Sequence, residues 1–275
     1  MPVPAFSPSS NPLSALAAAA LFADEVEAKL ARVESLAAAL ATAVPPGLTF
    51  GALALTRGVP ARPPRVAPNA VARRHPGSIA GRAALLHAIA HIEFSAIDLA
   101  LDHSLRFGGL PLQYHLDWLG VAVEEAMHFG LLRRHLRTLG HDYGDFPVHD
   151  ALWRMAERTA DDVLARMALV PRLLEARGLD ATPPIQRKLE AGGDEAAARL
   201  LDIILRDEVG HVGLGDRWFR FLCAERGLDP EPTFRELIVR HQAPWPQGEL
   251  NREARMAAGF ATGELDALTA GPPAR

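Results

Sequence analysis

The chain has 275 residues, and its 33 acidic and 29 basic side chains give a formal net charge of −4 at pH 7. A dedicated nucleic-acid-binding protein usually carries a basic excess, which this chain lacks, so nucleic acid is not the expected partner. Hydrophobic residues make up 49% of the sequence, enough to bury a large core. The one cysteine, Cys223, excludes both an internal disulfide and a metal site built from cysteines alone.

The N-terminal sequence does not have the pattern of a secretory signal peptide. The short apolar run at residues 13–22 has no Lys or Arg before it, and acidic residues follow it directly. No run approaches the roughly 20 apolar residues that span a bilayer. Together with the single thiol, which suits a reducing compartment, these features predict a cytoplasmic protein without membrane association.

The first third of the chain changes character twice. Residues 1–12 are rich in Ser and Pro and predict a loose terminus. Residues 13–43 are rich in Ala and Leu and contain neither Pro nor Gly, which predicts one helix. Residues 44–79 contain seven prolines, so we expect an extended strap there, with a short strand over residues 48–55.

Four long helical patterns follow, at residues 79–103, 112–139, 149–177 and 194–226. After Gly227 comes a tail with short helices near 233–241 and 249–268. Long helices without strand patterns predict an all-α protein, built on an antiparallel four-helix bundle. We therefore expect an N-terminal helix and strap at 1–78, a bundle at 79–227, and a tail at 228–275 that packs on the bundle.

Three of these helices place acids on apolar faces. Positions i, i+3, i+4 and i+7 share one face of a helix. On that basis Glu93 lies in the middle of an apolar stripe on the first helix. Glu125 and His128 lie on such a stripe in the second helix, and Glu208 and His211 in the fourth. Burying an unpaired carboxylate is costly, so carboxylates in such positions are usually paired or bind metal.

The spacing of the acids is regular. Glu-x-x-His occurs at residues 125–128 and again at 208–211, whereas random placement gives about 0.7 such motifs in a chain of this composition. Glu93 precedes the first motif by 32 residues, and Glu175 precedes the second by 33. Helical hairpins of equal length would bring the four carboxylates to a similar depth in the bundle.

This pattern resembles the di-iron carboxylate site of the ferritin-like superfamily, in which two helices each supply a Glu and two others supply Glu-x-x-His. The resemblance implies six metal ligands: Glu93, Glu125, His128, Glu175, Glu208 and His211. It implies that Glu125 and Glu208 bridge two metals, that Glu93 and Glu175 bind terminally, and that each histidine binds one metal.

The sequence around these residues narrows the resemblance. His-Ala-Ile-Ala-His-Ile-Glu at 87–93, Arg-Asp-Glu-Val-Gly-His at 206–211 and Leu-Glu-Ala-Arg-Gly-Leu-Asp at 174–180 look like the bacterial family called domain of unknown function 455. The Phe-Arg-Glu-Leu tail also fits that family, and the likeness runs from about residue 60 to residue 268. The sequence resembles the MiaE family of di-iron tRNA hydroxylases more distantly.

The resemblance implies an oxidoreductase that uses two iron ions and molecular oxygen to hydroxylate or oxidise a small organic substrate. An external electron donor is then required, because the sequence has no flavin or iron–sulfur motif. Manganese or a mixed pair is an alternative to iron, since oxygen-rich sites with some imidazole suit both metals. Two other functions stay open, a tRNA hydroxylase like MiaE and a non-catalytic iron- or manganese-binding protein, and so does a homodimer.

The alternative to metal binding is a set of buried ion pairs with arginine. It is most serious for Glu175, because Arg172 lies three residues before it and Pro171 disturbs the helix there. Three other acids compete with Glu175 for the role of third-helix ligand: Glu157, Asp161 and Asp162. Spacing and resemblance favour Glu175.

Other polar residues near the motifs have simpler interpretations. We expect His87 and His91 to be structural histidines, Glu124 to form a salt bridge and Cys223 to pack in the core. The two tyrosines, Tyr114 and Tyr143, give little support for a radical tyrosine beside the site.

Metal-bound histidines normally donate their other N–H to a carboxylate or carbonyl. The candidate partners are Asp98, Asp202 and Asp207, among which the sequence does not choose. A basic group at residues 133–137 is expected to be a solvated helix end that is favoured by the helix dipole.

Overall fold

The computed structural model describes residues 11–42, 48–52, 56–71 and 76–272. These residues form helices joined by turns, and within these ranges there is no β-strand, only an isolated bridge between Arg65 and Val148. The all-α prediction is therefore confirmed for the described residues. The strand predicted for 48–55 is not formed at 48–52, and residues 53–55 lie outside the described residues. Of the loose terminus predicted for 1–12, residues 1–10 also lie outside them, and the prediction is wrong for Asn11 and Pro12, because buried Asn11 caps α1 and Pro12 begins it.

The chain divides into two compact units, which we describe separately. The first unit comprises residues 1–64 and 91–130, and the second comprises residues 65–90 and 131–275. The helices of the first unit are α1 (Pro12–Leu21), α2 (Val26–Leu40), the C-terminal part of α3 (Ile79–Arg106) and the N-terminal part of α4 (Leu112–Thr138). The short 3₁₀ turn η1 (Pro68–Ala70) belongs to the second unit.

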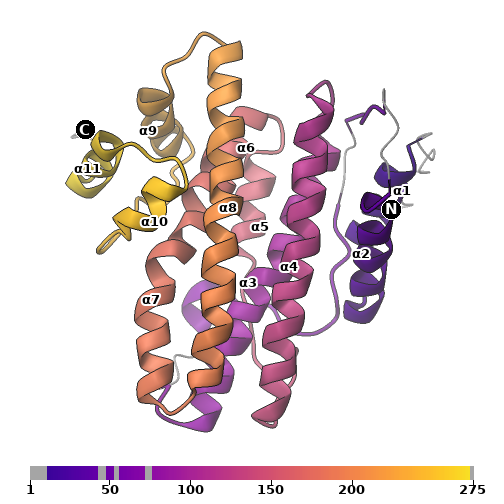
Figure 1. Cartoon of the computed structure of the whole chain (residues 1–275), viewed down its shortest axis with the longest axis vertical. Helices are drawn as coiled ribbons and strands as arrows, with labels where there is room; N and C mark the ends of the chain where they lie inside the picture. Colours follow the sequence, from indigo (N-terminus) through magenta and orange to yellow (C-terminus); the bar gives the residue numbers. More distant parts are fainter. Residues whose placement is uncertain (1–10, 43–47, 53–55, 72–75, 273–275) are drawn as a thin grey trace. The chain divides into compact units, whose positions relative to one another are not determined.

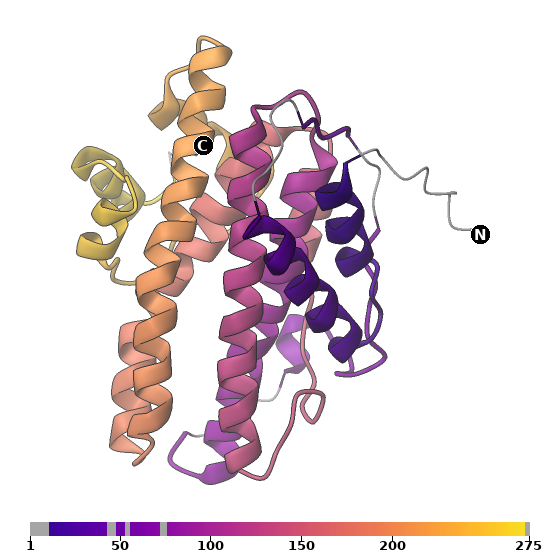
Figure 2. The same ribbon diagram turned by 45° about the vertical axis from the view of Figure 1, so that its right-hand side comes forward.

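The other elements of the second unit follow α4 in sequence: α5 (Ala151–Arg158), α6 (Val163–Leu169), the π-helical turn η2 (Val170–Glu175), α7 (Ala176–Ala191), α8 (Glu195–Glu225), α9 (Pro230–Arg240), α10 (Arg252–Ala257) and α11 (Thr262–Ala270). In this unit α7 packs along α8, and α6, η2, α9 and α10 also contact α8 (Figure 1). Figure 2 shows α7 and α8 side by side from a second direction.

The helix predicted for residues 13–43 is wrong, because the chain breaks between α1 and α2. The break is stabilised by contacts far along the sequence. The Lys29 ammonium donates to the carbonyls of Ala20 and Leu21 at the end of α1, and the backbone N–H of Gly58 also donates to Leu21 O. These donors satisfy carbonyls that would otherwise continue the helix, and no Pro or Gly signals the break in the sequence.

Lys29 also makes a buried ion pair in the first unit. Its Nζ lies 2.5 Å from an Asp98 carboxylate oxygen, and Arg57 lies 3.4 Å from the other oxygen. Burial raises the pKa of Asp98 above its ordinary value, and the charges and hydrogen bonds of Lys29 and Arg57 act against that increase. The pair attaches α2 and the strap to α3.

The third predicted helix, at 149–177, is also wrong in its limits. It is interrupted between α5 and α6, where Arg166 donates to Ala156 O and to the Thr159 hydroxyl, while the Asp162 carboxylate caps the start of α6. It also does not end at Gly178, which lies inside α7. One glycine costs a helix only about 1 kcal/mol, so the packing of α7 on α8 outweighs it.

The other helices agree with the predictions. The patterns at 79–103, 112–139 and 194–226 correspond to α3, α4 and α8, and the tail forms α9, α10 and α11. By length and composition alone α3 could cross a membrane, contrary to the expectation that no run would qualify. However, 72% of its apolar window is buried inside the protein, which is typical of the core helix of a soluble protein.

Candidate metal centre

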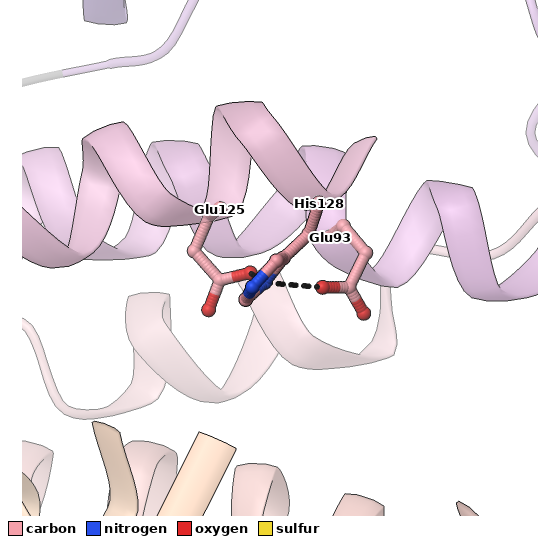
Figure 3. A group of neighbouring side chains, drawn as sticks. All are labelled: Glu93, Glu125 and His128. Atoms are coloured by element: carbon pink, nitrogen blue, oxygen red, sulfur yellow. Dashed lines mark ion pairs between the residues drawn. The ribbon is translucent and has the colours of Figure 1, made fainter. Parts of the chain in front are cut away.

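Three of the predicted ligands meet in the first unit. One ligand atom from each of Glu93, Glu125 and His128 lies within 4.8 Å of the other two. The His128 Nδ1 lies 3.3 Å from a Glu93 carboxylate oxygen and 3.5 Å from a Glu125 oxygen. Figure 3 shows the three side chains pointing toward one another, with Glu93 supplied by α3 and the other two by α4.

The apolar stripes predicted from the sequence bury these three side chains. The exposed fraction is 6% for Glu93, 2% for Glu125 and 0% for His128. The next residue on each helix is a buried phenylalanine, and the Phe94 and Phe129 rings pack with their centroids 5.1 Å apart. The polar group is therefore buried next to an apolar contact between α3 and α4.

The two carboxylates strongly stabilise positive charge on His128, which lies between them. Burial by itself lowers the pKa of His128, but the hydrogen bonds and charges of Glu125 and Glu93 outweigh burial and raise that pKa to about 10. Without a metal, the imidazole therefore carries a proton between two acids. A divalent cation in the same place would be stabilised by the same two carboxylates.

The group fits a first-row transition metal. Two ligands that bind one ion at about 2.1 Å, at an angle of about 90–110°, lie roughly 3.0–3.4 Å apart, close to the 3.3 Å and 3.5 Å between the His128 Nδ1 and the two carboxylates. Two carboxylates and one imidazole are a ligand set that suits iron and manganese.

The second Glu-x-x-His motif forms its own pair on α8 in the second unit. The His211 Nδ1 lies 3.3 Å from a Glu208 carboxylate oxygen. His211 is buried, whereas the Glu208 side chain is 13% exposed. A Cβ atom at Gly178 of α7 would lie 3.8 Å from the Glu208 Cγ, so this part of α7 faces the motif.

Glu175 ends the π-helical turn η2 and is half-buried. Gly178 follows it by three residues, and positions three apart share a helix face. Glu175 thus lies on the side of α7 that faces Glu208. The turn lies close to α8, because a Cβ at Gly215 would be 2.6 Å from the Pro171 Cβ. The sequence signal for this approach is the glycine in the apolar stripe of α8.

The competing acids have other roles in the structure. Glu157 accepts a hydrogen bond from the Trp153 indole at 3.1 Å. Asp162 caps α6 and pairs with Arg226 at 2.9 Å. Asp161 is exposed. Neither these three acids nor Glu175 belongs to a metal-capable group among the described residues, so the role of Glu175 as a ligand stays a prediction.

Arg172, the arginine that could have neutralised Glu175, is used elsewhere. It is fully buried, its Nε donates to Asp216 at 2.7 Å, and its Nη2 donates to Glu264. The guanidinium lies over three phenylalanine rings, at 4.1 Å from the centroid of the closest one, Phe234. The ion-pair alternative for Glu175 thus loses its nearest candidate.

The histidine predictions hold for His87. The backbone N–H of Gly144 donates to its Nε2 at 2.9 Å, and the ring packs against Tyr143 and Phe146. His91 is buried and, like His87, is outside the metal-capable groups of the described residues. Cys223 is also buried, and burial raises the pKa of its thiol to about 11, in agreement with a packing role.

The three candidate partners for ligand histidines have other contacts. Asp98 pairs with Lys29 and Arg57, Asp202 accepts from Gln186, and Asp207 pairs with Arg206. Two arginines of the basic group at residues 133–137 pair with one acid, Asp142.

That acid, Asp142, neutralises part of the basic group at residues 133–137. Arg133 and Arg137 approach it at 2.7 Å and 3.0 Å. Burial acts to raise the pKa of Asp142, but the hydrogen bonds of the two arginines outweigh burial and lower that pKa to about 2. Two of the three basic side chains are thus held by an acid, which weakens the case for a nucleic-acid surface.

The fold and this site define an all-helical protein with buried Glu and His side chains able to bind metal. The chain belongs to the family described as "Protein of unknown function (DUF455)", which it matches over residues 22–266. An uncharacterized protein from Haemophilus influenzae is 51% identical over 214 residues, which cover 75% of this chain and 74% of that relative. No solved structure matches the chain.

Proposed function

We propose that this protein is a ferritin-like di-metal oxidoreductase that uses molecular oxygen to hydroxylate or oxidise a small organic substrate. In this proposal, Glu93, Glu125 and His128 hold one ion, and Glu175, Glu208 and His211 hold the other. The observation that carries the proposal is the first of these groups: a buried set of two carboxylates and one imidazole that draws positive charge to itself.

The roles of the residues follow from their chemistry. A pair of ferrous ions, or manganese in their place, supplies oxygen activation when bound. Glu93 and Glu125 neutralise positive charge, and His128 must give up its proton before it can act as a ligand, so metal binding releases a proton. Phe94 and Phe129, which follow Glu93 and His128 in sequence and pack against each other, make the surroundings of the group apolar.

Electrons must come from outside the chain. The proposal therefore includes an external electron donor and an organic substrate as partners. It also assigns α3, α4, α8 and the broken helical segment from α5 to α7 to a ferritin-like bundle. As the resemblance implies, Glu125 and Glu208 would each be a ligand of both ions. Two ions joined by bridging carboxylates are magnetically coupled, so electron paramagnetic resonance of the manganese-loaded protein tests the bridge directly.

The main test is metal analysis followed by oxygen consumption. Apo protein is loaded with iron(II) without oxygen, its metal content is measured, and air-saturated buffer is then added. We expect close to two ions per chain and rapid oxygen uptake that continues when a chemical reductant is supplied. Uptake that stops after the loaded iron is oxidised would instead support iron handling without catalysis.

A metal content near zero after reconstitution would overturn the proposal. The matched control is Glu124→Ala, which removes a neighbouring exposed acid from the same helix. That variant is expected to keep both ions.

A further inference from the structure

The helical segment that carries Glu175 contains proline on both sides of that residue. Pro171 lies in η2, and Pro183 and Pro184 lie inside α7. Each proline lacks the backbone N–H that a helix uses, and each costs a helix interior about 3 kcal/mol. In particular, Pro183 cannot donate to the carbonyl of Leu179, four residues earlier. The carbonyls in this segment that lack a helical donor therefore need hydrogen-bond donors from outside the helix.

The C-terminal tail supplies the missing donor. The side-chain amide of Asn251 donates to Leu179 O at 3.1 Å, the carbonyl that Pro183 leaves without its helical partner. The Asn251 backbone N–H also donates to the Asp180 carboxylate at 2.9 Å. Arg255, fully buried, donates to that carboxylate at 2.6 Å and to Ala176 O at 3.2 Å. The tail therefore holds α7 directly after Glu175.

The tail also holds the residues before Glu175. Glu264 of α11 accepts from the Arg172 guanidinium, which donates with its Nε to Asp216 of α8. Arg220 completes this cluster, at 2.7 Å from Asp216 and 3.4 Å from Glu264. The position of Glu175 is thus set between two anchors, Arg172 on one side and α7 on the other.

We propose that the C-terminal tail positions Glu175, and that Asn251, Arg255 and Glu264 are positioning residues for the ion that Glu175 binds. This inference depends on the proposed function, because it takes Glu175 to be a ligand. With the tail contacts removed, the proline-containing segment shifts and the second ion binds weakly. The first ion, held by Glu93, Glu125 and His128, is not affected.

The experiment is a cobalt(II) titration of the full-length apo protein, followed by the visible absorption of bound cobalt. We expect wild type to bind two ions. Arg255→Gln is expected to weaken the second ion by about 10–100-fold, the usual effect of removing a group that orients a ligand, while the first keeps its affinity. Glu175→Gln should remove the same ion and the same part of the spectrum.

Two comparisons separate positioning from general destabilisation. Combining Arg255→Gln with Glu175→Gln should add nothing to the effect of Glu175→Gln alone. Trp245→Phe removes a hydrogen bond inside the tail, from the indole to Leu268 O at 2.8 Å, and is expected to leave both ions bound.

A milder variant covers the case in which Arg255→Gln does not fold. Asn251→Ser keeps an oxygen that can cap α10 but loses the amide donor to Leu179. Pro183→Ala restores a backbone N–H for that carbonyl, so Asn251→Ser should weaken the second ion less in the Pro183→Ala background than alone.

The outcomes distinguish the two proposals. If wild type binds no cobalt, the proposed function fails. If wild type binds two ions and both tail variants bind them with unchanged affinity, the positioning role is overturned while the metal site stands.

Discussion

The group around His128 and the cluster around Arg172 both bury charged side chains, but they balance charge differently. In the second unit, Arg172 and Arg220 face Asp216 and Glu264, two cations with two anions. In the first unit, Glu93 and Glu125 share one imidazole, whose pKa rises to about 10.

A structural cluster of buried charges normally contains its own counter-charges, because removing a charge from water is costly unless it is paired. The Arg172 cluster meets that condition. In the His128 group two carboxylates approach one imidazole and raise its pKa, and a bound cation would balance the same negative charge. The difference favours a structural role for the Arg172 cluster and supports the proposal of metal binding at the His128 group.

The largest expected effect is on metal content. Changing both Glu125 and Glu208 to Ala removes one proposed ligand from each metal ion. The metal content should therefore fall from two ions per chain to near zero. The apo variant should stay helical by circular dichroism and be as stable as apo wild type or more stable, since two costly buried carboxylates are gone. An apo variant that fails to fold would favour the structural ion-pair interpretation of both motifs.

The two clusters should respond oppositely when one acid is removed from the apo protein. Glu264→Ala leaves the buried Arg172 guanidinium with fewer counter-charges and should lower the free energy of unfolding by about 3–5 kcal/mol. Glu93→Ala should change it by no more than about 1 kcal/mol, because the variant loses the desolvation cost of one buried carboxylate while His128 keeps its pair with Glu125. Urea unfolding in the presence of a chelator measures both. Equal losses would mean that the two clusters have the same structural role.

A smaller effect is expected from glycines on α8. Gly215→Ala would place a Cβ 2.6 Å from Pro171, so η2 must move, at a cost of about 1–3 kcal/mol. The matched control is Gly210→Ala, where nothing lies within 4 Å and the helix gains up to about 1 kcal/mol. Thermal melts report the stabilities, and cobalt titration should show weaker binding of the second ion only for Gly215→Ala. Equal melting temperatures for the two variants would contradict the close packing of η2.

The smallest effect concerns Asp142, which is 38% exposed. Its folded pKa of about 2 is below the unfolded value of about 3.9. The stabilisation is therefore present above about pH 4 and is lost as the pH falls toward 2. Solvent screening reduces it to less than about 1 kcal/mol. The difference in unfolding free energy between wild type and Asp142→Asn should shrink from pH 5 to pH 2, and a constant difference would show that the arginines do not depress this pKa.

The sequence by itself determined the long helices α3, α4 and α8, because their apolar residues recur with the period of a helix over many turns. It also determined that Glu93, Glu125 and His128 share buried faces, since a residue's place on a helix follows from spacing alone. The structure brings these three together as the stripes predict. These results depend on the local geometry of a helix, which follows directly from the spacing of residues in the sequence.

Only the tertiary structure decided where helices stop and which partner each charge takes. The break after α1 depends on Lys29, which pairs with Asp98, 69 residues later. The continuity of α7 through Pro183 depends on Asn251, whose amide reaches Leu179 across 72 residues. Asp98 could have oriented a ligand histidine, but Lys29 and Arg57 occupy it instead. In each case a hydrogen bond between distant residues outweighs a local preference of about 1–3 kcal/mol, and no local pattern encodes the identity of the distant donor.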